Sequence, residues 1–209
     1  MPHQNQVDPC GALHAVSARG AWMGNRGIIH EGQVVKHRWK TNAWVTCRLD
    51  MPGTKRKPFS SNTYTELFFL DEATAFAAGH RPCNDCRPER FKEFKSAWFA
   101  ANVEQLISRP ALIAEVDAGL HRERVQSGDG PKVRLQRKLS ELPLGTMVEY
   151  LGAVCLLWRG RLRPWSFAGY GSPGAPPGPA QVVDVITPAS IVRVFDGGFV
   201  PQVHPSAYC

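Results

Sequence analysis

Two cysteines spaced as Cys-x-x-Cys, Cys83 and Cys86, are the side chains of this chain best suited to bind a metal. A single tight turn can present both thiolates to one ion, and zinc is the usual ion when further Cys or His ligands complete the set. Cys47 is the expected third ligand, because it lies on a predicted strand that precedes the turn. The sequence therefore predicts a zinc site.

The fourth ligand is expected to be a histidine. His30 is favoured, because it lies at the end of a predicted strand beside a turn. His37 stands between Lys36 and Arg38, in a strip better suited to solvent or to phosphate, and His80 shortly before the cysteine turn is a further alternative. The predicted metal ligands are Cys47, Cys83, Cys86 and His30.

Residues 66–88 carry a resemblance to a known zinc module, through Glu72-Ala73 and then Ala77-Ala78-Gly79-His80-Arg81-Pro82-Cys83-Asn84-Asp85-Cys86-Arg87-Pro88. This pattern resembles the second half of the zinc-binding domain of Ada, the bacterial DNA methylphosphotriester repair protein, which has EA, then AAG, an aromatic residue and RPC-x-x-C-x-P. The resemblance implies zinc binding and a role in DNA repair. The whole chain, with Gly24-Asn25-Arg26-Gly27 and residues 64–70, also resembles uncharacterised bacterial proteins.

The first half of the module departs from Ada, which has a Cys-x-x-x-Cys pair that includes the methyl-accepting thiol. This chain has Cys47 alone, with Ala43 and Met51 at the flanking offsets. Variants of the module with a histidine in place of one cysteine use their zinc structurally. The resemblance therefore implies a structural zinc, although a zinc-bound Cys47 thiolate would still be a nucleophile.

Pro-Cys-x-x-Cys is also the second half of the zinc deaminase pattern, which needs a glutamate two residues after the first ligand. That glutamate shuttles protons for the zinc-bound hydroxide. Leu49 stands at this offset from Cys47, and Gly32 stands at the same offset from His30. The sequence therefore argues against a deaminase.

The charge of the chain favours a polyanionic partner. Lys and Arg number 25 against 18 Asp and Glu, which gives a net charge of +7. Cations position phosphates, and a neighbouring Trp can stack on an unpaired base. We expect nucleic acid as the partner, DNA more than RNA. The predicted nucleic-acid-binding residues are Arg26, Lys36, Arg38, Trp39, Lys40, Lys55, Arg56, Lys57, Arg122 and Arg124.

No apolar stretch of this sequence is long enough to suggest a membrane span, and its N-terminal residues lack the pattern of a signal peptide. A cytoplasmic location is therefore expected, where free thiols and metal sites outnumber disulfides. A hydrophobic content of 43% is enough to form a core. The sequence does not indicate an oligomeric state.

Hydrophobic periodicity predicts an α+β fold, with a zinc-stapled α+β module at residues 21–105, a basic connector at 106–141 and a β-rich half at 142–209. Residues 1–20 are expected to be loosely ordered. Asp71 is the expected N-cap of a short helix. Helices are predicted at 72–78, 89–103 and 114–125. Strands are predicted around a turn at 31–32 and at 43–49, 67–70, 147–150, 153–158, 161–165, 182–186 and 191–195.

The leading hypothesis is a zinc-containing nucleic-acid-binding protein, linked to DNA repair or processing, in which the zinc is structural. The first alternative is an enzyme that acts on nucleic acid, as a nuclease, a base-removing enzyme or an alkyl acceptor. The second alternative is a zinc-stapled protein-interaction module. No catalytic residue follows from the sequence.

Overall fold

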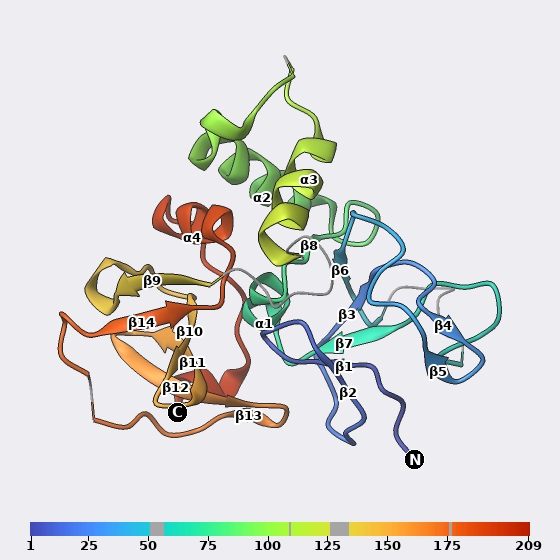
Figure 1. Cartoon of the computed structure of the whole chain (residues 1–209), viewed down its shortest axis with the longest axis horizontal. Coiled ribbons are helices and arrows are strands. Elements are labelled where there is room, and N and C mark those ends of the chain that lie inside the picture. The colour runs from blue at the N-terminus through green and yellow to red at the C-terminus, as the bar shows by residue number, and fades with distance from the viewer. Residues whose placement is uncertain (51–56, 109, 126–133, 176) are drawn as a thin grey trace.

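Two six-stranded sheets lie on opposite sides of a short central helix in the computed structural model of this chain (Figure 1). The structure describes residues 1–50, 57–108, 110–125, 134–175 and 177–209. The expected α+β class is confirmed. The C-terminus lies beside the second sheet and the N-terminus beside the first.

The first sheet has the strand order β2-β1-β7-β3-β6-β8. Its pairings are antiparallel except for β1 with β7 and β6 with β8, which are parallel. A separate hairpin, β4–β5, pairs His30 with Val35 around the expected turn. The strands are β1 Gln6–Val7, β2 Leu13–His14, β3 Trp22–Asn25, β4 His30–Glu31, β5 Val34–Val35, β6 Val45–Cys47, β7 Leu67–Phe69 and β8 Arg81–Pro82.

The second sheet has the strand order β13-β12-β11-β10-β14-β9, and all its pairings are antiparallel. Its central strands are buried on both faces, because Met147 and Leu156 pack in one hydrophobic cluster while their neighbours Val148 and Cys155 pack in another. The strands are β9 Leu135–Lys138, β10 Met147–Tyr150, β11 Ala153–Trp158, β12 Arg161–Ser166, β13 Gly169–Tyr170 and β14 Val182–Val185.

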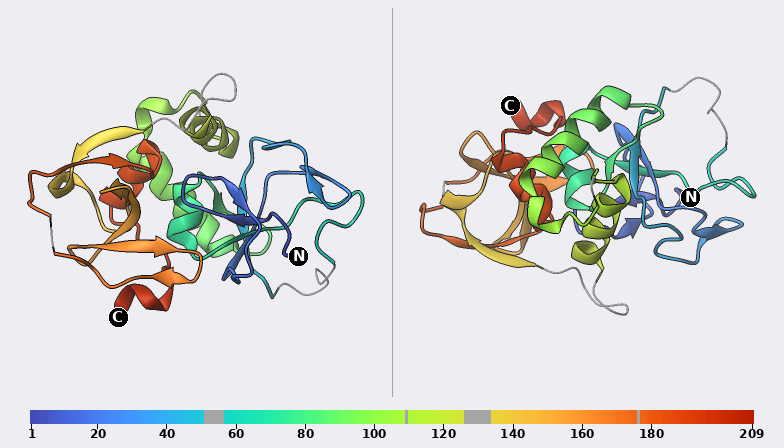
Figure 2. Two further views of the ribbon diagram at one scale, coloured as in Figure 1. Left: turned by 60° about the horizontal axis from the view of Figure 1, so that its bottom comes forward. Right: turned by 90° about the horizontal axis from the view of Figure 1, so that it is seen from above.

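The longer helices gather on one side of the central helix, and the view from above shows them close together (Figure 2). Helices α2 and α4 pack against each other and against α3 through apolar residues such as Phe94, Trp98 and Val194. The α-helices are α1 Glu72–Ala77, α2 Pro88–Ala101, α3 Ile113–Arg124 and α4 Ala189–Asp196. The 3-10 turns are η1 Val103–Gln105, η2 Leu139–Glu141 and η3 Pro205–Tyr208.

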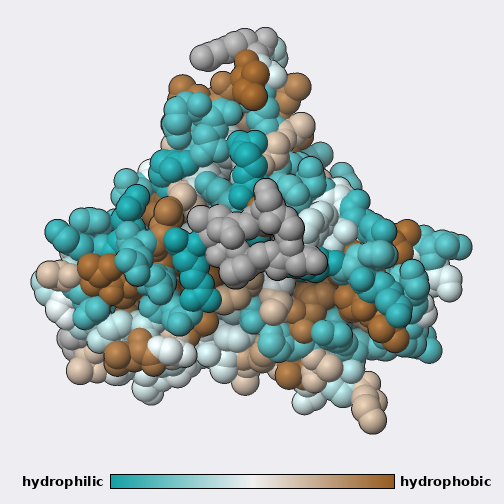
Figure 3. All heavy atoms as spheres, viewed as in Figure 1, coloured by the Kyte–Doolittle hydropathy of each residue, from teal (hydrophilic) through white to brown (hydrophobic). Residues whose placement is uncertain are grey.

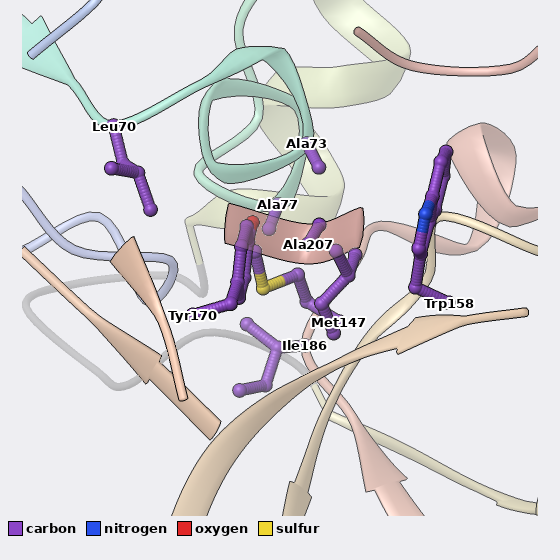
Figure 4. Close-up of a cluster of buried hydrophobic side chains, with 9 residues drawn as sticks. Leu70, Ala73, Ala77, Met147, Trp158, Tyr170, Ile186 and Ala207 are labelled. Atoms are coloured by element: carbon purple, nitrogen blue, oxygen red, sulfur yellow. The ribbon is translucent and has the colours of Figure 1, made fainter. Parts of the chain in front are cut away.

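Helix α1 contributes to three of the hydrophobic clusters among the described residues, and all of its residues are buried. Ala73 and Ala77 pack against the second sheet in a cluster with Met147 and Ile186 (Figure 4). Phe76 points into the cluster of the longer helices. Ala75 and Ala78 belong to the cluster of the first sheet. Small side chains on several faces of one helix thus allow both sheets to approach it closely.

Asp71 caps helix α1, as the sequence predicts. Its Oδ1 accepts hydrogen bonds from the backbone N–H of Thr74 at 2.8 Å and from the Thr74 hydroxyl at 2.7 Å. Its Oδ2 accepts from the Tyr170 hydroxyl at 2.7 Å and from the backbone N–H of His204 at 3.0 Å. The cap therefore also ties the start of the helix to the second sheet and the C-terminal segment.

Three sequence expectations differ from the structure. Residues 189–196 form helix α4 where a strand was expected, because Ile191, Val194 and Phe195 follow helical spacing and are buried on one face. Residues 1–20 contribute strands β1 and β2 to the first sheet. The connector at 106–141 contains, besides the expected helix α3, strand β9, which was not expected and pairs with β14 of the second sheet.

Within the part of the chain that the structure describes, no helix is both long enough and apolar enough to cross a membrane.

Candidate metal centre and basic surface

The structure brings together the three cysteines that the sequence groups. The sulfur atoms of Cys47, Cys83 and Cys86 all lie within 4.8 Å of one another, so these residues could hold a metal ion. Strands β6 and β8 position them, because their parallel pairing places Thr46 opposite Pro82 and the Cys83 N–H donates to the Thr46 carbonyl at 3.0 Å. The cysteine turn then leads directly into helix α2, which begins at Pro88.

The three thiols differ in the direction in which their pKa values are shifted. A hydrogen bond from Cys47 lowers the pKa of Cys83, and the backbone N–H groups of Cys86 and Asp85 lower it further. The same hydrogen bond, together with burial, raises the pKa of Cys47. Burial raises the pKa of Cys86. The cluster thus favours one thiolate, and a divalent cation would displace the remaining protons, as thiolate-bound metals do.

The structure does not bring His30 to the cysteines. Its Nδ1 lies 2.6 Å from the Thr65 hydroxyl, and its ring stacks on Phe59 at 4.8 Å between centroids. The hairpin β4–β5 that carries His30 is separate from the six-stranded sheet that carries Cys47. His80 lies in the core between Trp44 and Phe69. No histidine or carboxylate joins the three thiols among the described residues.

A pocket of about 370 Å³ opens beside the thiols, and the cysteines form part of its wall. Tyr64 and Asp85 also line it and supply oxygen atoms. Arg81 lines it too and forms a two-point ion pair with Asp117 of α3, with Nε–Oδ1 at 2.7 Å and Nη2–Oδ2 at 2.9 Å. This ion pair fixes helix α3 to the strand next to the cysteine turn.

Two basic segments that are far apart in the sequence meet at Trp44. The guanidinium of Arg26 lies 4.1 Å from the centre of the Trp44 ring, and that of Arg124 lies 3.9 Å from it. Trp39 lies nearby, 6.2 Å from Trp44 and 5.5 Å from His121 between ring centroids. Loop 36–44 is therefore packed against the C-terminal end of helix α3.

The predicted nucleic-acid-binding residues fall into three groups. Arg26 and Arg124 are 3% and 4% exposed, so they are core residues rather than surface cations. Lys36, Arg38 and Lys40 are exposed on one loop, with Trp39 half-buried between them. Arg122 is exposed on α3 and Lys57 is exposed elsewhere, while Lys55 and Arg56 lie outside the described residues.

Sequence reasoning missed Trp44 and His80 as parts of the basic region. Trp44 was predicted only as part of a strand. Its position between the basic residues 36–40 and 55–57 was the signal that could have placed it in the basic region. His80 accepts a hydrogen bond at Nε2 from Arg26 Nε at 3.3 Å. Arg134 lies far from Arg26 in the sequence but lines the same pocket, which no local pattern indicates.

Comparison with protein-family models, with curated proteins and with solved structures finds no match to this chain.

Proposed function

We propose that this protein is a zinc-containing nucleic-acid-binding protein, linked to DNA repair or processing, in which zinc has a structural role. Zinc fits the donor set, because three soft thiolates favour it over the hard cations that prefer oxygen ligands. The ion would hold strand β6 to the turn after β8 and so fix the start of helix α2. The Ada-like pattern of residues 66–88 supports the link to DNA repair.

The observation that carries nucleic-acid binding is the meeting of loop 36–44 and helix α3 around Trp44. Burial lowers the pKa of Arg26 to about 9, and the charge of Arg38 lowers it further. Burial likewise lowers the pKa of Arg124 to about 9, with a further contribution from Arg26. The exposed cations around this buried pair, Lys36, Arg38 and Lys40 on the loop and Arg122 on α3, can contact the phosphates of a polyanion. Trp39, half-buried among them, offers an aromatic surface for a base.

The test is the salt dependence of oligonucleotide binding, measured by fluorescence anisotropy with labelled single strands and duplexes. We expect log K to fall linearly with log salt between roughly 50 and 200 mM, because bound cations displace condensed counterions. The double variant Lys40→Gln/Arg122→Gln should make the slope shallower by about 1 to 2 units, since each lost phosphate contact removes about 0.7 to 0.9.

A matched control is Arg137→Gln/Lys138→Gln, which removes the same charge from exposed residues of strand β9. We expect it to leave the slope nearly unchanged. Absence of salt-sensitive binding to any single-stranded or duplex oligonucleotide would contradict the proposal. Equal slopes for the two double variants would place the contact surface elsewhere.

The pocket beside the thiols favours a second candidate, an enzyme acting on nucleic acid as an alkyl acceptor. Three protein ligands leave a tetrahedral zinc ion one position for water or substrate. Cys47 would then be the nucleophile, because a zinc-bound thiolate remains nucleophilic. Intact mass after incubation with methylated DNA separates the two candidates, because only the acceptor gains a methyl group on a cysteine.

The interaction-module alternative finds less support on the face shown in Figure 3. Hydrophobic residues there form small, separate patches between hydrophilic ones. Protein-docking surfaces are usually marked by larger continuous apolar areas.

A further inference from the structure

A second pocket, of about 470 Å³, lies on the N-terminal side of the molecule, away from the cysteines. The β1–β2 turn forms one wall through residues 10–13, and the loop after β5 forms another through residues 35–38. The basic side chains that line it are Arg26, Lys36, His37, Arg38 and Arg134. No aspartate or glutamate is among the described residues that line it, so its charge is strongly positive.

Arg26 forms the inner end of this pocket and is held rigidly. Its Nε donates to His80 Nε2, its Nη1 donates to the Gly11 carbonyl at 3.0 Å, and its plane lies over Trp44. Burial lowers the pKa of His80 well below its usual value, with Arg26 and Arg124 adding to the effect, so the imidazole is neutral and can accept this hydrogen bond. Two of the three guanidinium nitrogens are thus held in place, which pre-organises the group for a ligand at the third.

The third guanidinium nitrogen of Arg26, Nη2, has no hydrogen-bond partner among the described residues, and it is buried. An unpaired buried donor costs about 1–3 kcal/mol, and more when it is charged. Gly11, which also lines the pocket, borders this atom, because a β-carbon at position 11 would lie 3.6 Å from Nη2.

The nearby acids are already engaged. Asp8 raises the pKa of Arg26 by its charge, but its carboxylate accepts from the Ala12 N–H and contacts His14, both at 2.9 Å. Glu149 pairs with Arg134 at the rim. Lys36 and Arg38 face solvent on the loop after β5. The lining of the pocket thus gathers basic side chains from three parts of the chain around one buried guanidinium, an arrangement that suits an anion.

We propose that this pocket binds a phosphate group, with Arg26 Nη2 donating to a phosphate oxygen and Lys36 and Arg38 neutralising its charge at the mouth. The volume exceeds that of phosphate alone and lies in the range of small-molecule pockets, so the sugar of a nucleotide also enters. This inference rests on the proposed function, in which the phosphate belongs to a nucleic-acid strand.

The test is isothermal titration at fixed ionic strength with inorganic phosphate and with a short oligonucleotide, with and without a 5′-phosphate. Lys36→Gln/Arg38→Gln should weaken the binding of each phosphate-bearing probe about tenfold or more, because charge-assisted hydrogen bonds contribute roughly a tenfold step each. Arg26→Lys keeps the charge but removes Nη2, and should weaken binding similarly. The control variant Arg137→Gln/Lys138→Gln removes the same charge as the first variant and should change the affinity less than about twofold.

Lys36 and Arg38 are exposed, so their variant folds even if the core position Arg26 does not accept lysine. If both pocket variants bind the oligonucleotide as tightly as the control variant does, and binding is salt-sensitive, the pocket proposal is overturned while the proposed function stands. Phosphate binding that the pocket variants weaken, without any oligonucleotide binding, would support the pocket and contradict the proposed function. A preference for the 5′-phosphorylated oligonucleotide assigns the site to a strand end, and equal affinities assign it to the backbone.

Discussion

Replacing Cys83 by serine is expected to abolish tight zinc binding. Cys83 is the thiol whose pKa is lowered within the cluster, and its hydrogen bonds from Cys47 and from the turn amides prepare it as a thiolate ligand. A serine hydroxyl does not ionise at neutral pH and is a poor ligand for zinc. We expect the purified variant to contain less than one zinc ion per chain and to lose it readily to a chelator.

The same substitution should lower the thermal stability of the protein as purified. A ligand present at about a thousand times its Kd stabilises the folded state by about 4 kcal/mol. For a chain of 209 residues this corresponds to a fall in Tm on the order of 10 °C. Cys209→Ser is the control, because this cysteine is exposed and lies outside the metal group. A Cys83→Ser protein that retains zinc and Tm like the control would contradict the assignment.

Replacing Glu72 by alanine is expected to cause the largest loss of stability among the described ion pairs. The Glu72 side chain is 1% exposed, and it pairs with Arg87 at 2.6 Å and with Arg90 at 2.7 Å. It also accepts from the Gln202 backbone N–H at 2.8 Å. Its removal leaves the Arg87 guanidinium buried without a counter-charge, which costs about 3–5 kcal/mol. Urea unfolding of the wild-type protein and of the Glu72→Ala variant measures the difference in the free energy of unfolding.

An exposed ion pair on helix α2 offers a matched comparison. Glu89 pairs with Lys92 at 2.9 Å, but its side chain is 84% exposed, so Glu89→Ala should cost less than about 1 kcal/mol. Arg87 follows the cysteine turn and donates its N–H to the Cys83 carbonyl at 3.1 Å, so the Glu72 variant should also release zinc faster. Equal unfolding free energies for the two variants would show that the buried ion pairs of Glu72 contribute no more to stability than an exposed pair does.

Local patterns predicted much of this fold because they act over short distances. The N-cap at Asp71, the turn at residues 31–32 and the helix beginning at Pro88 all follow from the preferences of a few adjacent residues. The segment at 191–195 was misassigned because short apolar runs fit a strand and a buried helix equally well. Helical spacing at Ile191, Val194 and Phe195, with Gly197 after it, was the signal that separates them.

The candidate sites were only partly predictable, because their geometry depends on contacts between distant segments. Cys47 could be grouped with the Cys83 turn by its residue type and its strand. Nothing local indicated that Thr65 engages His30, or that Arg26 and Arg124 enclose Trp44 from residues nearly a hundred positions apart. Its charge led to the prediction that Arg26 is a surface cation, whereas the fold places it at the inner end of a pocket.

Zinc X-ray absorption spectroscopy of the protein, purified without added metal, tests the central claim most directly. Zinc held by the cysteine group should give one ion per chain, with three sulfur neighbours at about 2.3 Å and one lighter neighbour at about 2.0 to 2.2 Å. The sulfur count should match the group formed by Cys47, Cys83 and Cys86. Protein without stoichiometric zinc, or zinc without sulfur neighbours, would contradict the account.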